Sequence, residues 1–307
     1  MKTVLYIAII CLFGSASRGQ TPASVKQPAL LDHWIRATVA LGQIVDDGGT
    51  RRYVTVGSAV IVATDAHHVC LLTAKHVVFN PQTGYIPSVI YLRLPMRGPD
   101  SNTDLGIKVL LTAQGRNIWQ SLADGSDLAV LPIPDLSGES DVHAVGLQDF
   151  GGDDDIFQGA PILVLGYPAI LGPDYQTTPI ARGGIIAWTD PGNRLGSPFL
   201  VDANVFNGNS GGPVFRVRSG FDRYGNMRVV GGLAFIGIVV RDAIEQAPVH
   251  VGEQKIGQLD PKTGMPVPFE AGVQNIGGIG IVEPVSKARL LVEQFLGASS
   301  PSTPEKK

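Results

Sequence analysis

Short runs of valine, isoleucine and leucine recur along this chain, and turn-forming residues stand between them. Runs of this kind are typical of β-strands, while glycine, proline, asparagine and aspartate supply the backbone conformations that tight turns require. The 38 glycines and 22 prolines fit many short strands joined by such turns. We therefore predict an all-β fold, and the pattern alone allows β-sandwiches as well as β-barrels.

The strand candidates fall into two halves of similar character. A stretch rich in Gly, Ser and Asp at residues 137–159 indicates the connection between the halves. The strands of the first half are predicted at residues 57–62, 69–73, 89–94, 107–111 and 128–131. Those of the second half are predicted at residues 162–166, 184–188, 199–202, 213–217, 235–240 and 280–282.

Helices are predicted only near the two ends of this β-rich region. A short helix is expected at residues 30–37, and a longer one at residues 285–295 shows apolar residues at helical spacing. The apolar face of the longer helix consists of Leu290, Leu291, Val292 and Phe295. The Ser- and Pro-rich residues 299–307 are predicted to be a disordered tail.

The amino terminus has the three parts of an export signal. A positive charge at Lys2 precedes an apolar run at residues 4–13, and small residues follow at residues 14–17. The run is too short for a membrane span, which needs about 20 apolar residues. We predict a signal peptide at residues 1–19, and hence a secreted or periplasmic protein that does not contact the membrane after cleavage.

Cleavage would remove Cys11 and leave Cys70 as the only cysteine. No internal disulfide could then form, so the fold would depend on its core. Hydrophobic residues make up 44% of the chain, which is ample for one. Cys70 lies inside an apolar strand run, where we expect a buried and unreactive thiol.

Charge and ligand patterns argue against several classes of function. The formal net charge is −3, so the chain lacks the basic footprint of a nucleic-acid-binding protein. The pair His67 and His68 has no further metal ligands nearby, and the acidic run at residues 153–155 is more typical of a solvated loop than of a calcium site. We expect no nucleic-acid partner, no metal and no cofactor.

The sequence GNSGGP at residues 208–213 surrounds a serine with glycines. A serine hydroxyl is a poor nucleophile, which needs an adjacent base and hydrogen-bond donors for the oxyanion that it creates. Glycines allow a tight turn that presents two amides, those of Gly208 and Ser210, to one point in space. The same residues also favour a plain hairpin turn. Ser210 is thus a candidate nucleophile beside a candidate oxyanion hole.

A base and an acid for this serine are found in the first half. His76, in LTAKHVV at residues 72–78, stands where an apolar strand run meets a loop, and none of the other histidines follows a strand candidate in this way. Asp127 opens the apolar run DLAV and could orient the imidazole. Asp124 competes for this role, but the apolar run begins directly after Asp127, which favours Asp127.

The three candidates occur in the order His, Asp, Ser, with the serine alone in the second half. This distribution predicts a site between the two halves. GNSGG at residues 208–212 fits the Gly-x-Ser-x-Gly pattern of serine esterases, but those enzymes have the order Ser, Asp, His, and this chain has the reverse order. The residues therefore favour a serine peptidase.

These motifs resemble those of the trypsin-like peptidases of the chymotrypsin clan, and more closely those of the bacterial HtrA-like branch. The resemblance covers about residues 54–295 and includes GSAVI at residues 57–61, LGYP at 165–168 and GIGIVEPVSKA at 278–288. It implies two six-stranded antiparallel β-barrels, an active site in the cleft between them, and a C-terminal helix. Relative to the family, residues 241–277 are an insertion; a surface loop is the simplest interpretation, and a loop bordering the cleft is the alternative.

The resemblance divides the chain into parts and implies a function. Residues 20–298 would form the peptidase domain, with the first barrel at about 31–142 and the second barrel with the helix at about 143–298. Few residues follow, so we expect no PDZ domain of the kind that HtrA-like proteins usually carry. The implied function is a secreted serine endopeptidase that cuts protein or peptide substrates through an acyl-enzyme. The alternative is a catalytically silent or conformationally gated protein of the same fold that binds other proteins.

The resemblance also indicates which residues form the primary specificity pocket. In the family, the residue six before the nucleophile lies at the base of this pocket, and an Asp there holds Arg or Lys. This chain has Asn204 at that position, followed by Val205. Glutamyl endopeptidases place a His at the pocket wall where this chain has Val239. A pocket of Asn204, Val205 and Val239 predicts cleavage after small or medium apolar residues.

Overall fold

A computed structural model describes the part of the chain that carries these motifs. The described residues are 31–64, 68–80, 82–84, 86–94, 105–133, 140–169, 171, 177–229, 231–249 and 271–299. The predicted signal peptide at residues 1–19 lies outside these ranges, as does most of the predicted tail. Within them, no helix is long and apolar enough to cross a membrane.

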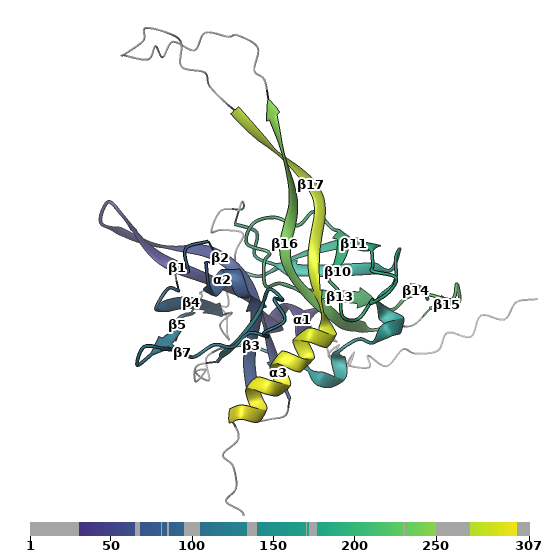
Figure 1. Cartoon of the computed structure of the whole chain (residues 1–307), viewed down its shortest axis with the longest axis horizontal. Helices are drawn as coiled ribbons and strands as arrows, with labels where there is room; N and C mark the ends of the chain where they lie inside the picture. The colour runs from purple at the N-terminus through teal and green to yellow at the C-terminus, as the bar shows by residue number, and fades with distance from the viewer. Residues whose placement is uncertain are drawn as a thin grey trace, which may run out of the picture. The chain divides into compact units, whose positions relative to one another are not determined.

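The first half of the fold is built from strands that follow a short helix (Figure 1). Its elements are α1 (Asp32–Ala37), β1 (Thr38–Asp47), β2 (Thr50–Ala63), β3 (Val69–Ala74), α2 (Lys75–Val78), β4 (Val89–Leu94), β5 (Leu105–Leu110), β6 (Thr112–Ala113), β7 (Arg116–Asn117), β8 (Leu128–Pro132) and β9 (Val145–Gly146).

The second half begins with two short 3₁₀ turns and ends with the longest helix. Its elements are η1 (Leu147–Asp149), η2 (Asp153–Asp155), β10 (Pro161–Gly166), β11 (Ile180–Trp188), β12 (Phe199–Asp202), β13 (Pro213–Val217), β14 (Gly220–Phe221), β15 (Met227–Arg228), β16 (Leu233–Val249), β17 (Ala271–Pro284) and α3 (Val285–Ser299).

The two halves form two curved antiparallel sheets. In the second half, the strands close into a barrel in the order β10-β11-β12-β17-β16-β13. In the first half, the order is β5-β4-β1-β2-β3-β8, and β9 adds a short parallel pair to β2. The first sheet is a strongly curled half-barrel, because among the described residues no ladder joins β5 to β8. Gln120 forms an isolated antiparallel bridge to Val130 of β8, with backbone hydrogen bonds of 3.0 and 2.9 Å.

The mostly β, chymotrypsin-like fold is therefore confirmed, with one closed barrel and one half-barrel. Strand β1 is absent from the predicted strands. Its first residues, Thr38 to Gly42, are all buried, so it lacks the alternation of a half-exposed strand. The register also shifts between Leu41 and Gly42. A Cβ at Gly42 would lie 2.6 Å from the backbone carbonyl oxygen of Val54, so glycine is favoured at this bulge.

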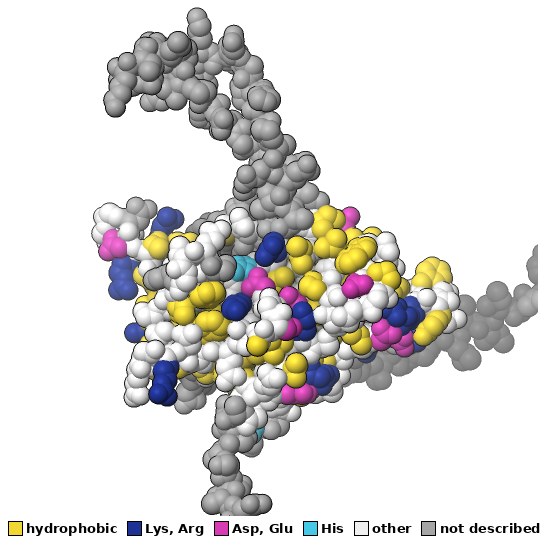
Figure 2. Space-filling view, in the orientation of Figure 1, with side chains coloured by type: hydrophobic (Ala, Val, Ile, Leu, Met, Phe, Trp, Pro, Cys, Tyr) yellow, Lys and Arg dark blue, Asp and Glu magenta, His cyan; other side chains and the backbone are white. Residues whose placement is uncertain are grey.

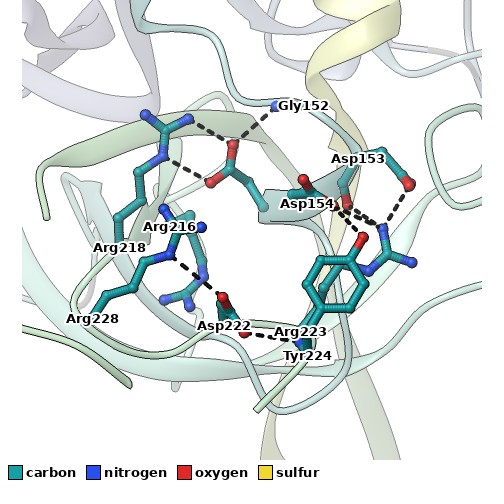
Figure 3. Close-up of a pocket in the computed structure, with 10 residues that line it drawn as sticks. Gly152, Asp153, Asp154, Arg216, Arg218, Asp222, Arg223, Tyr224 and Arg228 are labelled. Carbon is teal, nitrogen blue, oxygen red and sulfur yellow. Dashed lines mark hydrogen bonds and ion pairs between the residues drawn. The ribbon is translucent and has the colours of Figure 1, made fainter. Parts of the chain in front are cut away.

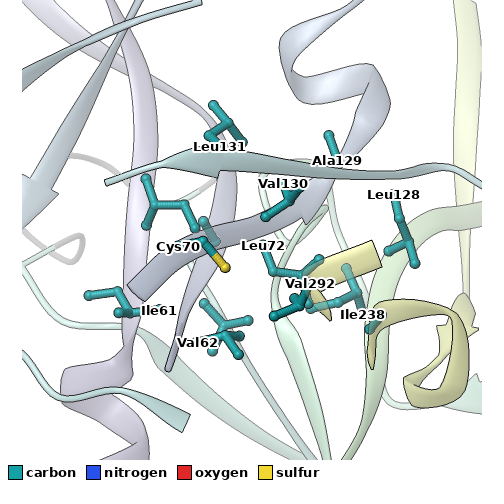
Figure 4. Packing of buried hydrophobic residues seen from close by; sticks show 14 of the residues in the cluster. Ile61, Val62, Cys70, Leu72, Leu128, Ala129, Val130, Leu131, Ile238 and Val292 are labelled. Atoms are coloured by element: carbon teal, nitrogen blue, oxygen red, sulfur yellow. The ribbon is translucent and has the colours of Figure 1, made fainter. Parts of the chain in front are cut away.

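A large apolar core holds the half-barrel, α3 and part of the closed barrel together. Cys70 is fully buried in this core, among side chains of β2, β3 and β8 such as Val62 and Leu131 (Figure 4). Burial raises the pKa of the Cys70 thiol to about 12, so the reactive thiolate is strongly disfavoured. A second core, which includes Val201 and Val282, fills the closed barrel.

Helix α3 differs in two respects from its prediction. It continues to Ser299, one residue into the predicted tail. Its buried face includes Ala288 and Leu291, whereas Leu290 is 49% exposed. The prediction of Leu290 on the apolar face is wrong because the buried residues Ala288, Leu291, Val292 and Phe295 follow i, i+3, i+4 and i+7 spacing, which places Leu290 on the opposite side of the helix.

The predicted insertion at residues 241–277 is not a simple surface loop. Strands β16 and β17 continue into it as a long antiparallel ladder, with Ile244 opposite Ile276 and Val249 opposite Ala271. Figure 1 shows this two-stranded ribbon extending away from the closed barrel. The first residue of the insertion, Arg241, lines a pocket described below, so the base of the ribbon borders that pocket.

Candidate active site

Neighbouring strands bring His76 and Asp127 together. In the pairing of β3 with β8, Ala74 lies opposite Leu128. His76 follows β3 in the first turn of α2, and Asp127 directly precedes β8, so both lie at the same end of the strand pair. The Nδ1 atom of His76 is 2.8 Å from Oδ2 of Asp127. The backbone amide of His76 also donates to Oδ1 of Asp127, at 3.0 Å.

The choice between Asp127 and Asp124 has a geometric answer. Both carboxylate oxygens of Asp127 contact His76, and its carbonyl accepts the amide of Lys75 at 3.0 Å. Asp124 instead accepts the amide of Ser126 at 2.9 Å and lies 3.5 Å from Nζ of Lys287. Slight desolvation alone would raise the pKa of Asp124, but hydrogen bonds from Ser126 and the charge of Lys287 lower it. The imidazole is therefore held by Asp127.

The loop around Ser210 is locked against the first sheet by its backbone. The amide of Ser58 in β2 donates to the carbonyl of Ser210 at 2.7 Å, and the Ser58 hydroxyl donates to the carbonyl of Gly208 at 2.8 Å. Gly211 has a φ of +87°, and a Cβ there would lie 1.9 Å from the carbonyl oxygen of Ser58. The glycines of the motif are therefore required by a positive φ and by close contact between the two halves.

Two amides of this loop form the candidate oxyanion hole. The amides of Asn209 and Gly211 donate to the carbonyls of Phe206 and Val239, at 3.0 and 2.7 Å. Among the described residues, the amides of Gly208 and Ser210 donate to no protein acceptor. These two donors are thus left for a ligand.

His76, Asp127 and Ser210 line one pocket of about 600 Å³. The pocket lies between the two halves, since Ser210 and Arg241 come from the second half. The other lining residues are Lys75, Phe79, Gln82, Gly125, Ser126, Asn207 and Val240. The structure therefore brings together the three residues that the sequence indicated for catalysis.

The residues predicted for specificity do not line this pocket. Val205 is 2% exposed and Val239 is 0% exposed, and both belong to the core of the closed barrel. Asn204 is exposed, with a φ of +48°, and its carbonyl accepts a hydrogen bond from the guanidinium of Arg182. That guanidinium also lies over the ring of Phe206, 4.2 Å from its centroid. Sequence reasoning missed Arg182, which no motif marks.

A second pocket, of about 640 Å³, lies beside η2 and the hairpin β14–β15 (Figure 3). The charges around it are paired with one another. Arg218 donates two hydrogen bonds to Asp155, at 2.8 and 2.7 Å, and Arg223 contacts Asp153 at 2.6 Å and Asp154 at 3.2 Å. This side of the closed barrel is therefore held by a network of ion pairs.

The network corrects the interpretation of residues 153–155 as a wholly solvated loop, because Asp155 is buried. Burial alone would raise the pKa of Asp155, but hydrogen bonds from Arg218 and Gly152 and nearby guanidinium charges lower it below its ordinary value. In the described ranges, no three His, Cys, Asp or Glu side chains are grouped to hold a metal ion. On the face shown in Figure 2, basic and acidic side chains are intermixed.

A closed β-barrel packed against a curled half-barrel, with a His–Asp pair and a serine at their junction, defines a chymotrypsin-like architecture. Residues 57–221 match the model of the trypsin-like peptidase domain, a span of more than half of the 307-residue chain. The chain belongs to the trypsin-like peptidase domain family. No curated protein matches the chain significantly. Members of this family are usually serine hydrolases that act on proteins.

Proposed function

We propose that this protein is a serine endopeptidase with His76, Asp127 and Ser210 as its catalytic triad. The observation that carries the proposal is the 2.8 Å contact between His76 and Asp127 in the pocket that Ser210 also lines. A carboxylate in this position fixes the tautomer and orientation of the imidazole and stabilises its charged form. The His76 ring then presents its other nitrogen, Nε2, as the base.

In the proposed reaction, Nε2 of His76 takes the proton of the Ser210 hydroxyl while Oγ attacks the scissile carbonyl carbon. The amides of Gly208 and Ser210 stabilise the oxyanion that forms. His76 returns the proton to the leaving amine as the peptide bond breaks, which leaves an acyl-enzyme on Ser210. A water molecule, deprotonated by the same imidazole, then hydrolyses the ester and restores the serine.

We further propose that the enzyme is exported and acts in the periplasm or outside the cell, because residues 1–19 have the composition of a signal peptide. The motif resemblance favours the HtrA-like branch of the family. The substrates would be proteins or peptides.

For specificity, we expect cleavage after small or medium apolar residues. Asn204 offers no carboxylate to a lysine or arginine side chain, and the guanidinium of Arg182 beside it repels one. One methylene in such a pocket discriminates by about 1–3 kcal/mol, so selectivity should be broad.

The test is digestion of an unbiased peptide library, with cleavage sites read by mass spectrometry. The Ser210→Ala protein, purified in the same way, controls for contaminating peptidases. Ala, Val and similar residues should be enriched before the cut only with the wild-type protein. A dominant preference for Arg, Lys or Glu at that position would contradict the predicted pocket, whereas no cleavage at all would count against the proposed function.

A further inference from the structure

A buried carboxylate lies behind the His76–Asp127 pair, on the opposite half of the molecule. Glu283, near the end of β17, is only 5% exposed. Its Oε1 atom accepts a hydrogen bond from the backbone amide of Asp127, at 3.2 Å. Its Oε2 atom accepts one from Nζ of Lys287 in α3, at 3.1 Å. Glu283 therefore connects the closed barrel and α3 to the loop that carries Asp127.

Stability alone is a poor explanation for this buried pair. Transferring a carboxylate from water to a protein interior costs free energy, and the attraction within a buried ion pair often does not exceed this desolvation penalty. Apolar side chains of similar size are often as stabilising or more so. Ile238, which lies opposite Glu283 in the ladder of β16 and β17, is fully buried and would accept an apolar neighbour. The pair is better explained by the contact that Glu283 makes.

That contact completes the fixation of Asp127. The carboxylate of Asp127 is held by His76, and its carbonyl accepts the amide of Lys75. Its own amide has Glu283 as its acceptor. In the segment before Asp127, residues 123–125 are exposed, whereas Leu122 and Ser126 are buried. Lys287 lies 3.5 Å from Asp124 and thus also ties this loop to α3.

We propose that Glu283, oriented by Lys287, is a positioning residue that holds the Asp127 carboxylate in contact with His76. The proposal rests on the proposed serine peptidase function. Glu283 acts on the reaction only through Asp127. Its loss should therefore lower the rate of acylation without changing how the substrate binds. A misplacement of about 1 Å in a catalytic group can cost on the order of 100-fold in rate.

The main test is a variant that keeps volume but removes the contact, the double substitution Glu283→Met and Lys287→Met. We expect its melting temperature to stay near that of the wild type while kcat falls about 10- to 100-fold and KM changes less than about threefold. Glu283→Gln retains an acceptor oxygen for the Asp127 amide and should recover most of the loss. Glu293→Ala, which removes an exposed carboxylate from α3, the helix that carries Lys287, is the control. Unchanged kcat in the double variant would overturn the proposal.

A double-mutant cycle with Asp127→Ala distinguishes a positioning effect of Glu283 from a general loss of structure in the active site. Without the Asp127 carboxylate there is nothing for Glu283 to position, so the double methionine substitution should cause no further loss in that background. An activated ester substrate keeps these low rates measurable. An equal fold-loss in both backgrounds would contradict the proposal.

A readout independent of turnover distinguishes failure of this inference from failure of the proposed function. A proton held between Nδ1 of a histidine and a carboxylate at this distance is expected to give a far-downfield NMR signal. We expect it in the wild-type and Glu283→Gln proteins, and its loss or broadening in the double methionine variant. An inactive wild-type protein would refute the peptidase proposal, while this signal would still test the positioning role. An unchanged signal in the double variant would refute that role.

Discussion

Replacing Ser210 by alanine should reduce kcat for peptide hydrolysis on the order of 10⁶-fold. Removing the nucleophile of a catalytic triad leaves only the residual catalysis that comes from substrate binding and the oxyanion donors. Initial rates on a fluorogenic peptide, taken from the library cleavage sites, provide the measurement.

The Ser210→Ala protein should fold normally. The bond that fixes this loop to β2 runs from the amide of Ser58 to the carbonyl of Ser210, and alanine keeps that carbonyl. Circular dichroism and a melting temperature near the wild-type value should verify this. Cleavage at a comparable rate by a correctly folded Ser210→Ala protein would remove Ser210 from its proposed role.

Replacing Asp127 by asparagine should lower kcat by roughly 10⁴-fold. The amide nitrogen of asparagine can donate to Nδ1 of His76, which stabilises the wrong tautomer and leaves Nε2 unable to accept the serine proton. The geometry should otherwise survive, because asparagine has nearly the same shape. The effect should appear in kcat rather than in KM, as measured by steady-state kinetics.

The matched control is Asp124→Asn, which makes the same chemical change in the same loop. Among the described residues, Asp124 contacts Ser126 and Lys287, whereas His76 contacts Asp127. We expect at most a severalfold loss of activity from this substitution. The assignment of the acid would have to change if Asp124→Asn produced the large loss and Asp127→Asn did not.

The strands and the site motifs could be predicted from sequence because their signals are local. Apolar runs marked strands such as β4 and β12 with the bounds that the structure has. The glycines around Ser210 predicted a tight turn, and the structure shows two of them, Gly208 and Gly211, at positive φ. The pairing of β3 with β8, which places His76 beside Asp127, was not itself predicted, since strand partners depend on the whole sheet.

Features that depend on distant contacts were missed or misplaced. Glu283 lies far along the chain from Asp127, and nothing around either residue indicates that they meet. The resemblance to related peptidases assigned Val205 and Val239 to the specificity pocket, yet both side chains belong to the core of the closed barrel. The extension of β16 and β17 into a ribbon was missed because residues 241–249 and 271–277 contain no long apolar run.

Labelling with a fluorophosphonate probe tests most directly whether Ser210 is an activated nucleophile. Such a probe reacts only with a serine that is activated by a base, and the serine Oγ displaces fluoride to form a stable phosphonyl ester. We expect a single labelled peptide containing Ser210, with labelling slowed strongly by Asp127→Asn and absent in Ser210→Ala. Failure to label Ser210 in the folded wild-type protein, under conditions that label an active serine peptidase, would contradict this expectation and identify a catalytically silent member of the fold.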